Sequence, residues 1–149
     1  MKVSFYQFNE LKNQDLYSIL RLRSEVFVIE QNCIYQDIDN KDQIALHVIG
    51  EVENKIVAYT RIFKSGDYFK KASIGRVIVK KSYRNKNYGK KIMDLSIKRI
   101  IKLKENTIEL SAQKYLIKFY SDLGFCREGE EYLEDNIPHV KMKLKITSN

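Results

Sequence analysis

Basic side chains gather around one glycine in YRNKNYGKK, residues 83–91. The segment follows a run of β-branched residues, 73–80, and leads into a helical pattern. A helix N-terminus offers unpaired N–H groups and a partial positive charge, so it favours anions. Arg84, Lys86, Lys90 and Lys91 add charge, and Gly89 would allow close backbone approach and an unusual φ. The pattern predicts a site for a phosphate or pyrophosphate group at residues 84–90.

The elements that must position this loop follow the order β-α-β-β-β-α-β-α-β-β. Alternating hydrophobic residues predict the strands, and i, i+3, i+4 spacing predicts the helices. Asp15 is expected to cap the first helix, Glu53 and Asn54 to form a tight hairpin turn, and Gly124 to end the last helix. The predicted strands cover 3–8, 44–52, 56–64, 73–80, 108–112, 125–133 and 139–146. Predicted helices cover 16–30, the stretch that ends near 104, and 116–123. This order predicts an α/β chain with a mixed sheet, distinct from a doubly wound Rossmann fold.

Composition places the chain among ordinary globular proteins. It has 149 residues, 44% of them hydrophobic and 31% charged, and we expect one domain over residues 1–149. Cys33 and Cys126 stand in no metal-binding or disulfide motif, so neither a metal site nor a disulfide framework is predicted. No secretory leader and no membrane-spanning apolar run is visible, and a cytoplasmic location is expected. The net charge of +8 favours an anionic partner.

Several segments resemble one enzyme family. GRVIVKKSYRNKNYGKKIM (75–93) resembles motif A of the GNAT acetyltransferases, whose loop runs R/Q-x-x-G-x-G/A. Arg84, Asn87 and Gly89 occupy its three positions, with Asn87 where the family usually has glycine. Because Asn also tolerates a left-handed φ, we expect the turn to survive. AQKYLIKFYSDLGF (112–125) is similar to motif B, and LRSEVFVIEQNCIYQDIDNKD (22–42) and DNIPHVKM (135–142) are similar to the ElaA type of this family.

The resemblance implies a fold and a cofactor. The fold would be a mixed, mostly antiparallel sheet flanked by helices, with a splay between the two central strands. The cofactor would be acetyl-CoA, whose acetyl group passes to a primary amine by direct attack in a ternary complex. The chain would be an acyl-CoA N-acyltransferase. Its cofactor would pair with the backbone of Val77, Ile78 and Val79 along the pantetheine arm and touch the amide of Gln113. The pyrophosphate would be bound by Arg84, Asn85, Lys86, Asn87, Tyr88, Gly89 and Lys90.

The resemblance also implies catalytic residues. Tyr120 matches the family tyrosine that protonates the departing thiolate; its spacing alone equally suits a tyrosine of the hydrophobic core. No motif assigns the general base, which an amine nucleophile requires because its ordinary pKa is about 10.4. The candidates are Glu30, His139 and His47, and His47 lies on a strand pattern that also suits a structural histidine. A base acting through water is a further alternative.

An acidic loop lies between the first helix and the second strand. Asp37, Asp39 and Asp42 either form a cation-binding rim or are solvated residues that make local Asx-turns. Arg23, on the first helix, is placed to pair with one of these carboxylates and hold the loop.

Two other functions remain compatible with the sequence. A non-enzymatic nucleic-acid-binding module could use a basic-aromatic surface, but no recognised motif supports it and no nucleic-acid partner is predicted. That surface would consist of Lys70, Lys71, Lys80, Lys81, Arg84 and Lys86 with Tyr68, Phe69 and Tyr83. A CoA-binding regulator without catalysis is the second alternative. The expected partner is a small-molecule or peptide amine, no membrane association is expected, and a homodimer is compatible with the sequence.

Overall fold

The computed structural model describes residues 1–146, which form one seven-stranded sheet in the order β1-β2-β3-β4-β5-β7-β6. All neighbouring strands are antiparallel except β4 and β5, which are parallel. The predicted mixed, mostly antiparallel sheet is therefore confirmed. The strands are β1 (Lys2–Gln7), β2 (Leu46–Val52), β3 (Lys55–Phe63), β4 (Ala72–Val79), β5 (Thr107–Gln113), β6 (Cys126–Glu134) and β7 (Ile137–Lys145).

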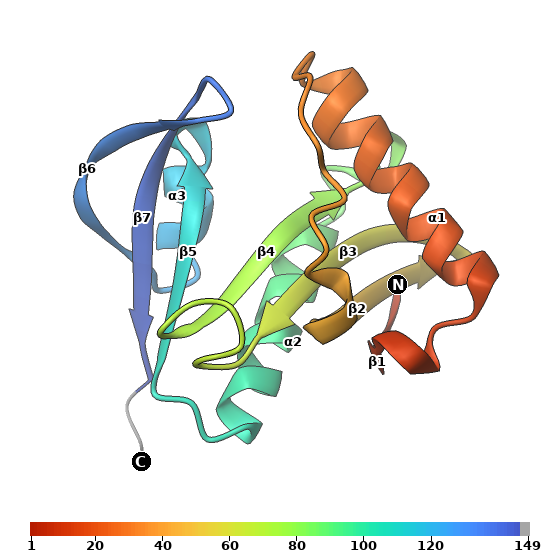
Figure 1. Cartoon of the computed structure of the whole chain (residues 1–149), viewed down its shortest axis with the longest axis horizontal. Helices are drawn as coiled ribbons and strands as arrows, with labels where there is room; N and C mark the ends of the chain where they lie inside the picture. Colours follow the sequence, from red (N-terminus) through yellow and green to blue (C-terminus); the bar gives the residue numbers. More distant parts are fainter. Residues whose placement is uncertain (147–149) are drawn as a thin grey trace.

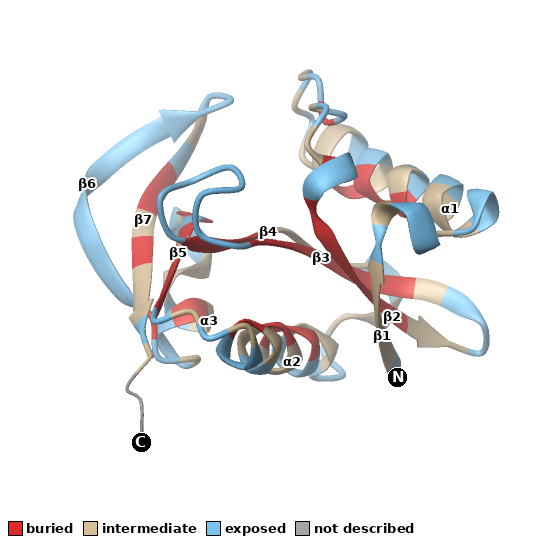
Figure 2. Ribbon diagram, turned by 60° about the horizontal axis from the view of Figure 1, so that its bottom comes forward, coloured by how far each residue is buried: buried red, intermediate tan, exposed pale blue. Residues whose placement is uncertain are grey.

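Helices cover both faces of the sheet (Figures 1 and 2). Helix α1 (Asn13–Arg23) lies on one face, while α2 (Tyr88–Lys102) and α3 (Ile117–Ser121) lie on the other. The α2–α3 side holds the larger core, in which Ile92, Met93 and Ile100 of α2 are fully buried against the sheet. A smaller core joins Ile19 and Leu22 of α1 to residues of β2, β3 and β4. Burial of these faces fixes the strands that carry the loops.

Most predicted boundaries agree with the structure to within two or three residues. The turn between β2 and β3 has Glu53 at φ 50° and Asn54 at φ 60°, the left-handed pair that a two-residue hairpin requires. Gly124 has φ 92° directly after the turn that ends α3. The predicted cap at Asp15 is wrong, because α1 begins earlier and Lys12 occupies its N-cap position. Asp15 instead lies in the first turn, where its charge still complements the helix dipole.

The first predicted helix changes its geometry halfway. The chain is α-helical to Arg23 and then forms a π-helix over Ser24–Glu30. The Cys33 N–H donates to the Val28 carbonyl, five residues earlier, at 3.1 Å. Wider turns of this kind are rare and occur often at functional sites. Within residues 1–146, no helix combines the length and apolar character needed to cross a bilayer.

Candidate active site

The two central strands diverge and open a cavity between them. β4 and β5 pair only through Ala72 with Ile108 and Ser73 with Glu109, and then separate (Figure 1). A cavity of about 1290 Å³ follows this split and is lined by residues of both strands. The splay that the family resemblance implied is therefore present. One end of the cavity meets the 84–90 loop, and the other meets the β6–β7 hairpin.

A β-bulge distorts β4 beside the split. Tyr59 pairs with Ile78 and Arg61 pairs with Gly75, so two residues of β4 face one residue of β3. Arg76 lies in this bulge with φ 52°, a left-handed value that costs a non-glycine residue free energy. Its guanidinium holds it there, because Nη2 donates to the Asp37 carbonyl at 3.0 Å and Nε lies 2.7 Å from Asp37 Oδ1.

Beyond the bulge, β4 presents unpaired backbone groups to the cavity. The Lys80 N–H donates to the Val57 carbonyl of β3 at 2.7 Å. Because backbone direction alternates along a strand, the polar groups of Val79 and Val77 face the β5 side, where no strand pairs with them. The Val79 carbonyl accepts a hydrogen bond from Arg84 Nε at 3.0 Å. Ile78 differs, since it pairs with Tyr59 and its side chain is buried against α1.

The loop after β4 has the conformation of an anion-binding turn. Asn85 and Asn87 have φ 62° and 58°, so Asn87 does take the left-handed conformation expected of it. The expectation of an unusual φ at Gly89 is wrong: Gly89 lies in the first turn of α2 and is not among the residues with positive φ. An added Cβ would lie 3.6 Å from Phe119 and 3.7 Å from Val79, which are ordinary contacts, so the protein itself leaves room for a side chain here.

The amides of this loop have no partner within residues 1–146. Arg84 N–H donates to the Lys81 carbonyl, and the first hydrogen bond of α2 runs from Lys91 N–H to the Asn87 carbonyl. Between them, six consecutive N–H groups, from Asn85 to Lys90, make no backbone hydrogen bond, and no side chain caps the helix. These donors at the positive end of α2 can bind an anion such as a phosphate group. The side chains of Lys86 and Lys90 lie at the same end and are exposed.

Arg84 turns away from the loop and binds Glu30. Its Nη1 and Nη2 donate to the two carboxylate oxygens of Glu30, the second at 2.9 Å. The hydrogen bond from Arg84 lowers the pKa of Glu30. Glu30, at the end of the π-helix, thus anchors the loop and is a weak proton acceptor in this arrangement.

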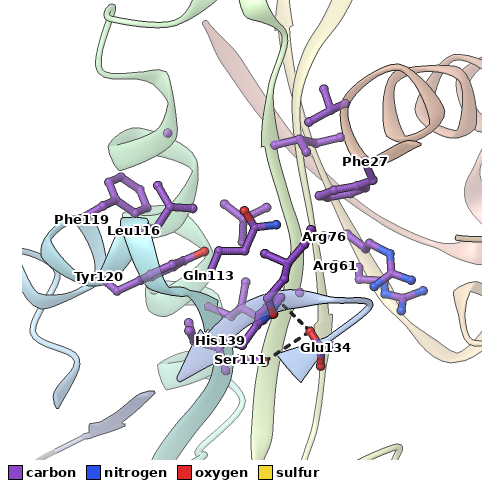
Figure 3. A pocket seen from close by; sticks show the side chains of 18 of the residues that line it. Phe27, Arg61, Arg76, Ser111, Gln113, Leu116, Phe119, Tyr120, Glu134 and His139 are labelled. Atoms are coloured by element: carbon purple, nitrogen blue, oxygen red, sulfur yellow. Dashed lines mark hydrogen bonds and ion pairs between the residues drawn. The ribbon is translucent and has the colours of Figure 1, made fainter. Parts of the chain in front are cut away.

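A second contact crosses the split nearby. Gln113, at the end of β5, donates from Nε2 to Gln31 Oε1 at 3.1 Å. Gln31 follows the π-helix directly, so the wider turn places it opposite β5. The Gln113 amide is therefore in the cavity but is shared with Gln31 (Figure 3).

Tyr120 lies on α3 with its hydroxyl directed into the cavity (Figure 3). The residue is 5% exposed, and its ring packs edge-to-face against Phe119 and Phe125. Burial, with Tyr115 nearby, raises its pKa, so the hydroxyl keeps its proton at neutral pH. Within residues 1–146, the Tyr120 hydroxyl makes no hydrogen bond, although a buried tyrosine usually does. The ring belongs to the core while the O–H remains available.

His139 lies on the opposite wall in a polar cluster. Its Nδ1 lies 2.6 Å from the Ile137 carbonyl oxygen, which can only accept, so Nδ1 carries a proton. Its Nε2 lies 3.2 Å from Glu134 Oε2, and the ring stacks on Tyr132. Ser111 joins the cluster through the Tyr132 hydroxyl and through Glu134 Oε2 at 3.4 Å. Nδ1 is thus engaged by the Ile137 carbonyl, and Nε2 is the ring nitrogen that faces the polar cluster.

His47 is placed differently from the other candidate bases. It is 1% exposed, its Nδ1 lies 2.8 Å from the Tyr59 hydroxyl, and its Nε2 lies 2.9 Å from the Asp42 carbonyl oxygen. Burial lowers its pKa, so the ring is neutral at pH 7. Both ring nitrogens have partners, which makes His47 a structural histidine.

The aspartates of the acidic loop form ion pairs with buried arginines. Arg23, fully buried, donates from Nε to Asp37 at 2.8 Å and from Nη1 to Asp42 at 2.6 Å, which confirms the predicted pairing. Arg61 binds Asp39 and Asp42. The picture of a solvated loop is wrong, because Asp37 and Asp42 are buried. Only Asp39 makes a local turn of the predicted kind, by accepting the Lys41 N–H. Within residues 1–146, no three acidic, histidine or cysteine side chains are grouped to hold a metal ion.

The proposed basic-aromatic surface is divided in two. Tyr68 and Phe69 lie in the loop before β4 with their ring centroids 4.1 Å apart, while Lys80–Lys86 follow the other end of the strand. An eight-residue strand of about 26 Å separates the two groups.

Several cavity residues escaped the sequence prediction. Glu134 and Ser111 lie outside the quoted motifs, Arg76 lies within 75–93 but was given no role, and the neighbours of all three come from distant segments. The alternation of polar residues at Ser111 and Gln113 with buried Leu110 and Ala112 was the one available signal, since it indicates a polar face on β5.

Comparisons with known proteins agree with this geometry. Residues 9–146 match the acetyltransferase (GNAT) domain family. ElaA of Escherichia coli K12 is 39% identical over 141 residues, covering 93% of this chain and 92% of ElaA. The crystal structure of E. coli ElaA has a TM-score of 0.90 at 36% identity and covers 97% of this chain and all of that chain. An acyl-CoA N-acyltransferase from Pseudomonas aeruginosa has a TM-score of 0.90 at 31% identity, covering 97% and 99%. The chain therefore belongs to the GNAT acetyltransferase family.

Proposed function

We propose that this protein transfers an acetyl group from acetyl-CoA to a primary amine by direct attack in a ternary complex. The observation that carries the proposal is the diverging β4–β5 split, with six free amides at one end and the Tyr120 hydroxyl in its wall. Acetyl-CoA would supply an acetyl group activated as a thioester.

The residues of the split fit the different parts of the cofactor. The amides of Asn85–Lys90 would hold the pyrophosphate, with the exposed ammonium groups of Lys86 and Lys90 beside it. The backbone groups of Val77 and the Val79 N–H would pair with the pantetheine arm as a missing strand would, while the Val79 carbonyl is held by Arg84 Nε. Ile78 would contribute by packing, and Arg84 by fixing the end of β4 rather than by touching phosphate.

Two coenzyme A complexes of the same fold support this choice of cofactor. An aminoglycoside 6'-N-acetyltransferase with coenzyme A has a TM-score of 0.77 at 14% identity. The PaiA N-acetyltransferase of Thermoplasma acidophilum with coenzyme A has a TM-score of 0.72 at 16% identity.

Tyr120 would act as the general acid. Its raised pKa keeps the proton in place, and the lack of a protein partner leaves the O–H free for the departing sulfur. A thiolate that forms in an apolar site is stabilised by a nearby proton donor.

His139 would accept the proton of the attacking amine at Nε2. Its Nδ1 is fixed by the Ile137 carbonyl, and Glu134 would stabilise the imidazolium that forms. Glu30 is less suited to this role, because Arg84 occupies both of its oxygens.

The proposal is tested by an acceptor screen that records coenzyme A release and the acetylated product by mass spectrometry. Product formation with any primary amine supports it. If acetyl-CoA raises the melting temperature and no amine is acetylated, the protein is a CoA-binding regulator. If acetyl-CoA neither raises the melting temperature nor acetylates any amine, the assignment of the split as a cofactor site is overturned.

A further inference from the structure

The cavity is charged differently from the chain as a whole. The chain carries a net charge of +8, yet six carboxylates and five lysine or arginine side chains line the cavity. Four of the six carboxylates pair with lysine or arginine, namely Glu30 with Arg84, Asp39 with Arg61, Glu109 with Lys141, and Asp122 with Lys118. Within residues 1–146, Glu134 and Asp135 make no such pair. Both lie at the tip of the β6–β7 hairpin.

Glu134 is held in place through one of its two oxygens. Oε2 lies 3.2 Å from His139 Nε2 and 3.4 Å from Ser111 Oγ (Figure 3). Oε1 has no hydrogen bond within the described residues, and the side chain is 50% exposed. Ser111 Oγ is placed to donate to Oε2, the Nε2 edge of His139 lies beside the same oxygen, and Oε1 remains open to the cavity.

Positive charge on the facing wall does not compete for this oxygen. Arg61 and Arg76 line the cavity there, but Asp37, Asp39 and Asp42 surround them with contacts of 2.7–3.5 Å. Lys141, on the same face as Glu134, is bound between Glu109 and Glu128. An ammonium group brought to Glu134 would therefore meet an unneutralised carboxylate.

The same cavity contains a second group without a protein partner. The Tyr120 side chain, 5% exposed, directs its hydroxyl into the cavity, and within residues 1–146 neither this hydroxyl nor Glu134 Oε1 has a hydrogen-bond partner. Tyr132, stacked on His139, and Tyr35 also line the cavity, and aromatic faces attract cations.

We propose that the acceptor carries a second positive charge, and that Glu134 Oε1 binds this distal ammonium while the reacting amine faces His139. This inference rests on the acetyl transfer proposed above and names its acceptor class: a diamine or another amine with a cationic tail. Glu134 is then a specificity-determining residue. A matched amine that ends in a methyl group loses the contact, and one that ends in a carboxylate is repelled.

The experiment uses three acceptors of equal chain length: 1,5-diaminopentane, pentylamine and 5-aminopentanoate. We expect kcat/KM to be highest for the diamine, by roughly tenfold over pentylamine, which is the ratio one charge-assisted hydrogen bond sustains. The amino acid should be the poorest acceptor. In Glu134→Gln, the ratio of diamine to pentylamine should fall close to one. Using this ratio removes any equal effect on all acceptors that comes from the loss of the His139 contact.

The matched control is Glu130→Gln, on the same strand, exposed and outside the cavity lining. It should leave the ratio unchanged. Equal kcat/KM for all three acceptors in the native protein overturns the inference, as does a diamine preference that Glu134→Gln retains.

Failure of acetyl transfer itself is read separately. If none of the three acceptors is acetylated, calorimetric titration of 1,5-diaminopentane into the protein, with and without coenzyme A, decides. Binding that Glu134→Gln weakens about tenfold supports the site although the proposed reaction fails. No binding, or binding that is insensitive to Glu134, overturns it.

Discussion

Arg84 joins Glu30 to the end of β4, with two hydrogen bonds to the carboxylate and one from Nε to the Val79 carbonyl at 3.0 Å. The contact connects the π-helix after α1 to the loop before α2, and both residues line the cavity. It therefore positions the loop amides, and it occupies a carboxylate that the sequence offered as a general base.

Replacing Glu30 tests which of these roles it has. Glu30→Gln should raise KM for acetyl-CoA several-fold, because the loop loses its contact with Glu30. It should leave kcat nearly unchanged, because Glu30 takes no part in the proposed chemical step. Stability should change by about 0–1 kcal/mol, since both partners are partly exposed. A control is Glu131→Gln, which breaks the exposed pair with Lys114 outside the cavity. A large fall in kcat with unchanged KM would instead make Glu30 the base.

Gly89 provides a test of the phosphate loop in which stability and binding should move in opposite directions. Gly89→Ala places Cβ 3.6 Å from Phe119, an ordinary contact, and alanine favours the helix by about 0.8–1.0 kcal/mol. The protein alone should melt at the same or a higher temperature, while the added methyl group crowds the amides around the pyrophosphate. The rise in melting temperature with acetyl-CoA should shrink. Scanning calorimetry with and without acetyl-CoA measures the melting temperature of the variant and its rise on binding. A rise equal to that of the native protein would remove Gly89 from the site.

The order of elements and the loop could be read from the sequence because they are local. The spacing of hydrophobic residues predicted the strands and helices. Asn87, at φ 58°, shows that asparagine adopts the left-handed conformation at the position where the family has glycine. The φ of Gly89 was mispredicted because the helix begins at Tyr88, so Gly89 has helical backbone geometry and the left-handed residues are Asn85 and Asn87.

The rest of the site depends on long-range contacts. The π-helix at Ser24–Glu30 and the bulge at Arg76 are unfavourable locally and are stabilised by partners far along the chain. Asp37 holds Arg76 from 39 residues away, and Glu134 meets Ser111 only because β6 and β5 flank β7. A single sequence shows the residues but not these pairings.

Arg23 should be essential for folding. Arg23→Met leaves Asp37 and Asp42 buried with less compensation, and loss of one partner of a buried ion pair costs about 3–5 kcal/mol. Arg21→Met, on the exposed face of the same helix, should change stability by no more than about 0.5 kcal/mol. Urea denaturation of both variants measures the difference. Equal stability of the two would mean that the network contributes little.

Asp39 should make stability depend on pH below about 4. Burial alone would raise its pKa, but the hydrogen bond from Arg61 and the charges of Arg61 and Arg76 lower it to about 2. Because folding lowers the pKa of Asp39, its ionised carboxylate contributes about 2 kcal/mol to the free energy of unfolding above pH 4. This contribution is lost as the pH falls toward 2. Asp39→Asn should therefore be less stable than the native protein at pH 6, with a difference that narrows toward pH 2. A difference that stays constant with pH would contradict the pairing.

Tyr120→Phe tests acetyl transfer at this site most directly, because it keeps the ring between Phe119 and Phe125 and removes only the hydroxyl. Steady-state kinetics on the folded variant should show kcat reduced by roughly 10²–10⁴, the range for a positioned acid. The melting temperature and its shift with acetyl-CoA should change little, since the hydroxyl has no partner within residues 1–146. A kcat equal to that of the native protein would contradict the account and leave Tyr120 as a residue of the core.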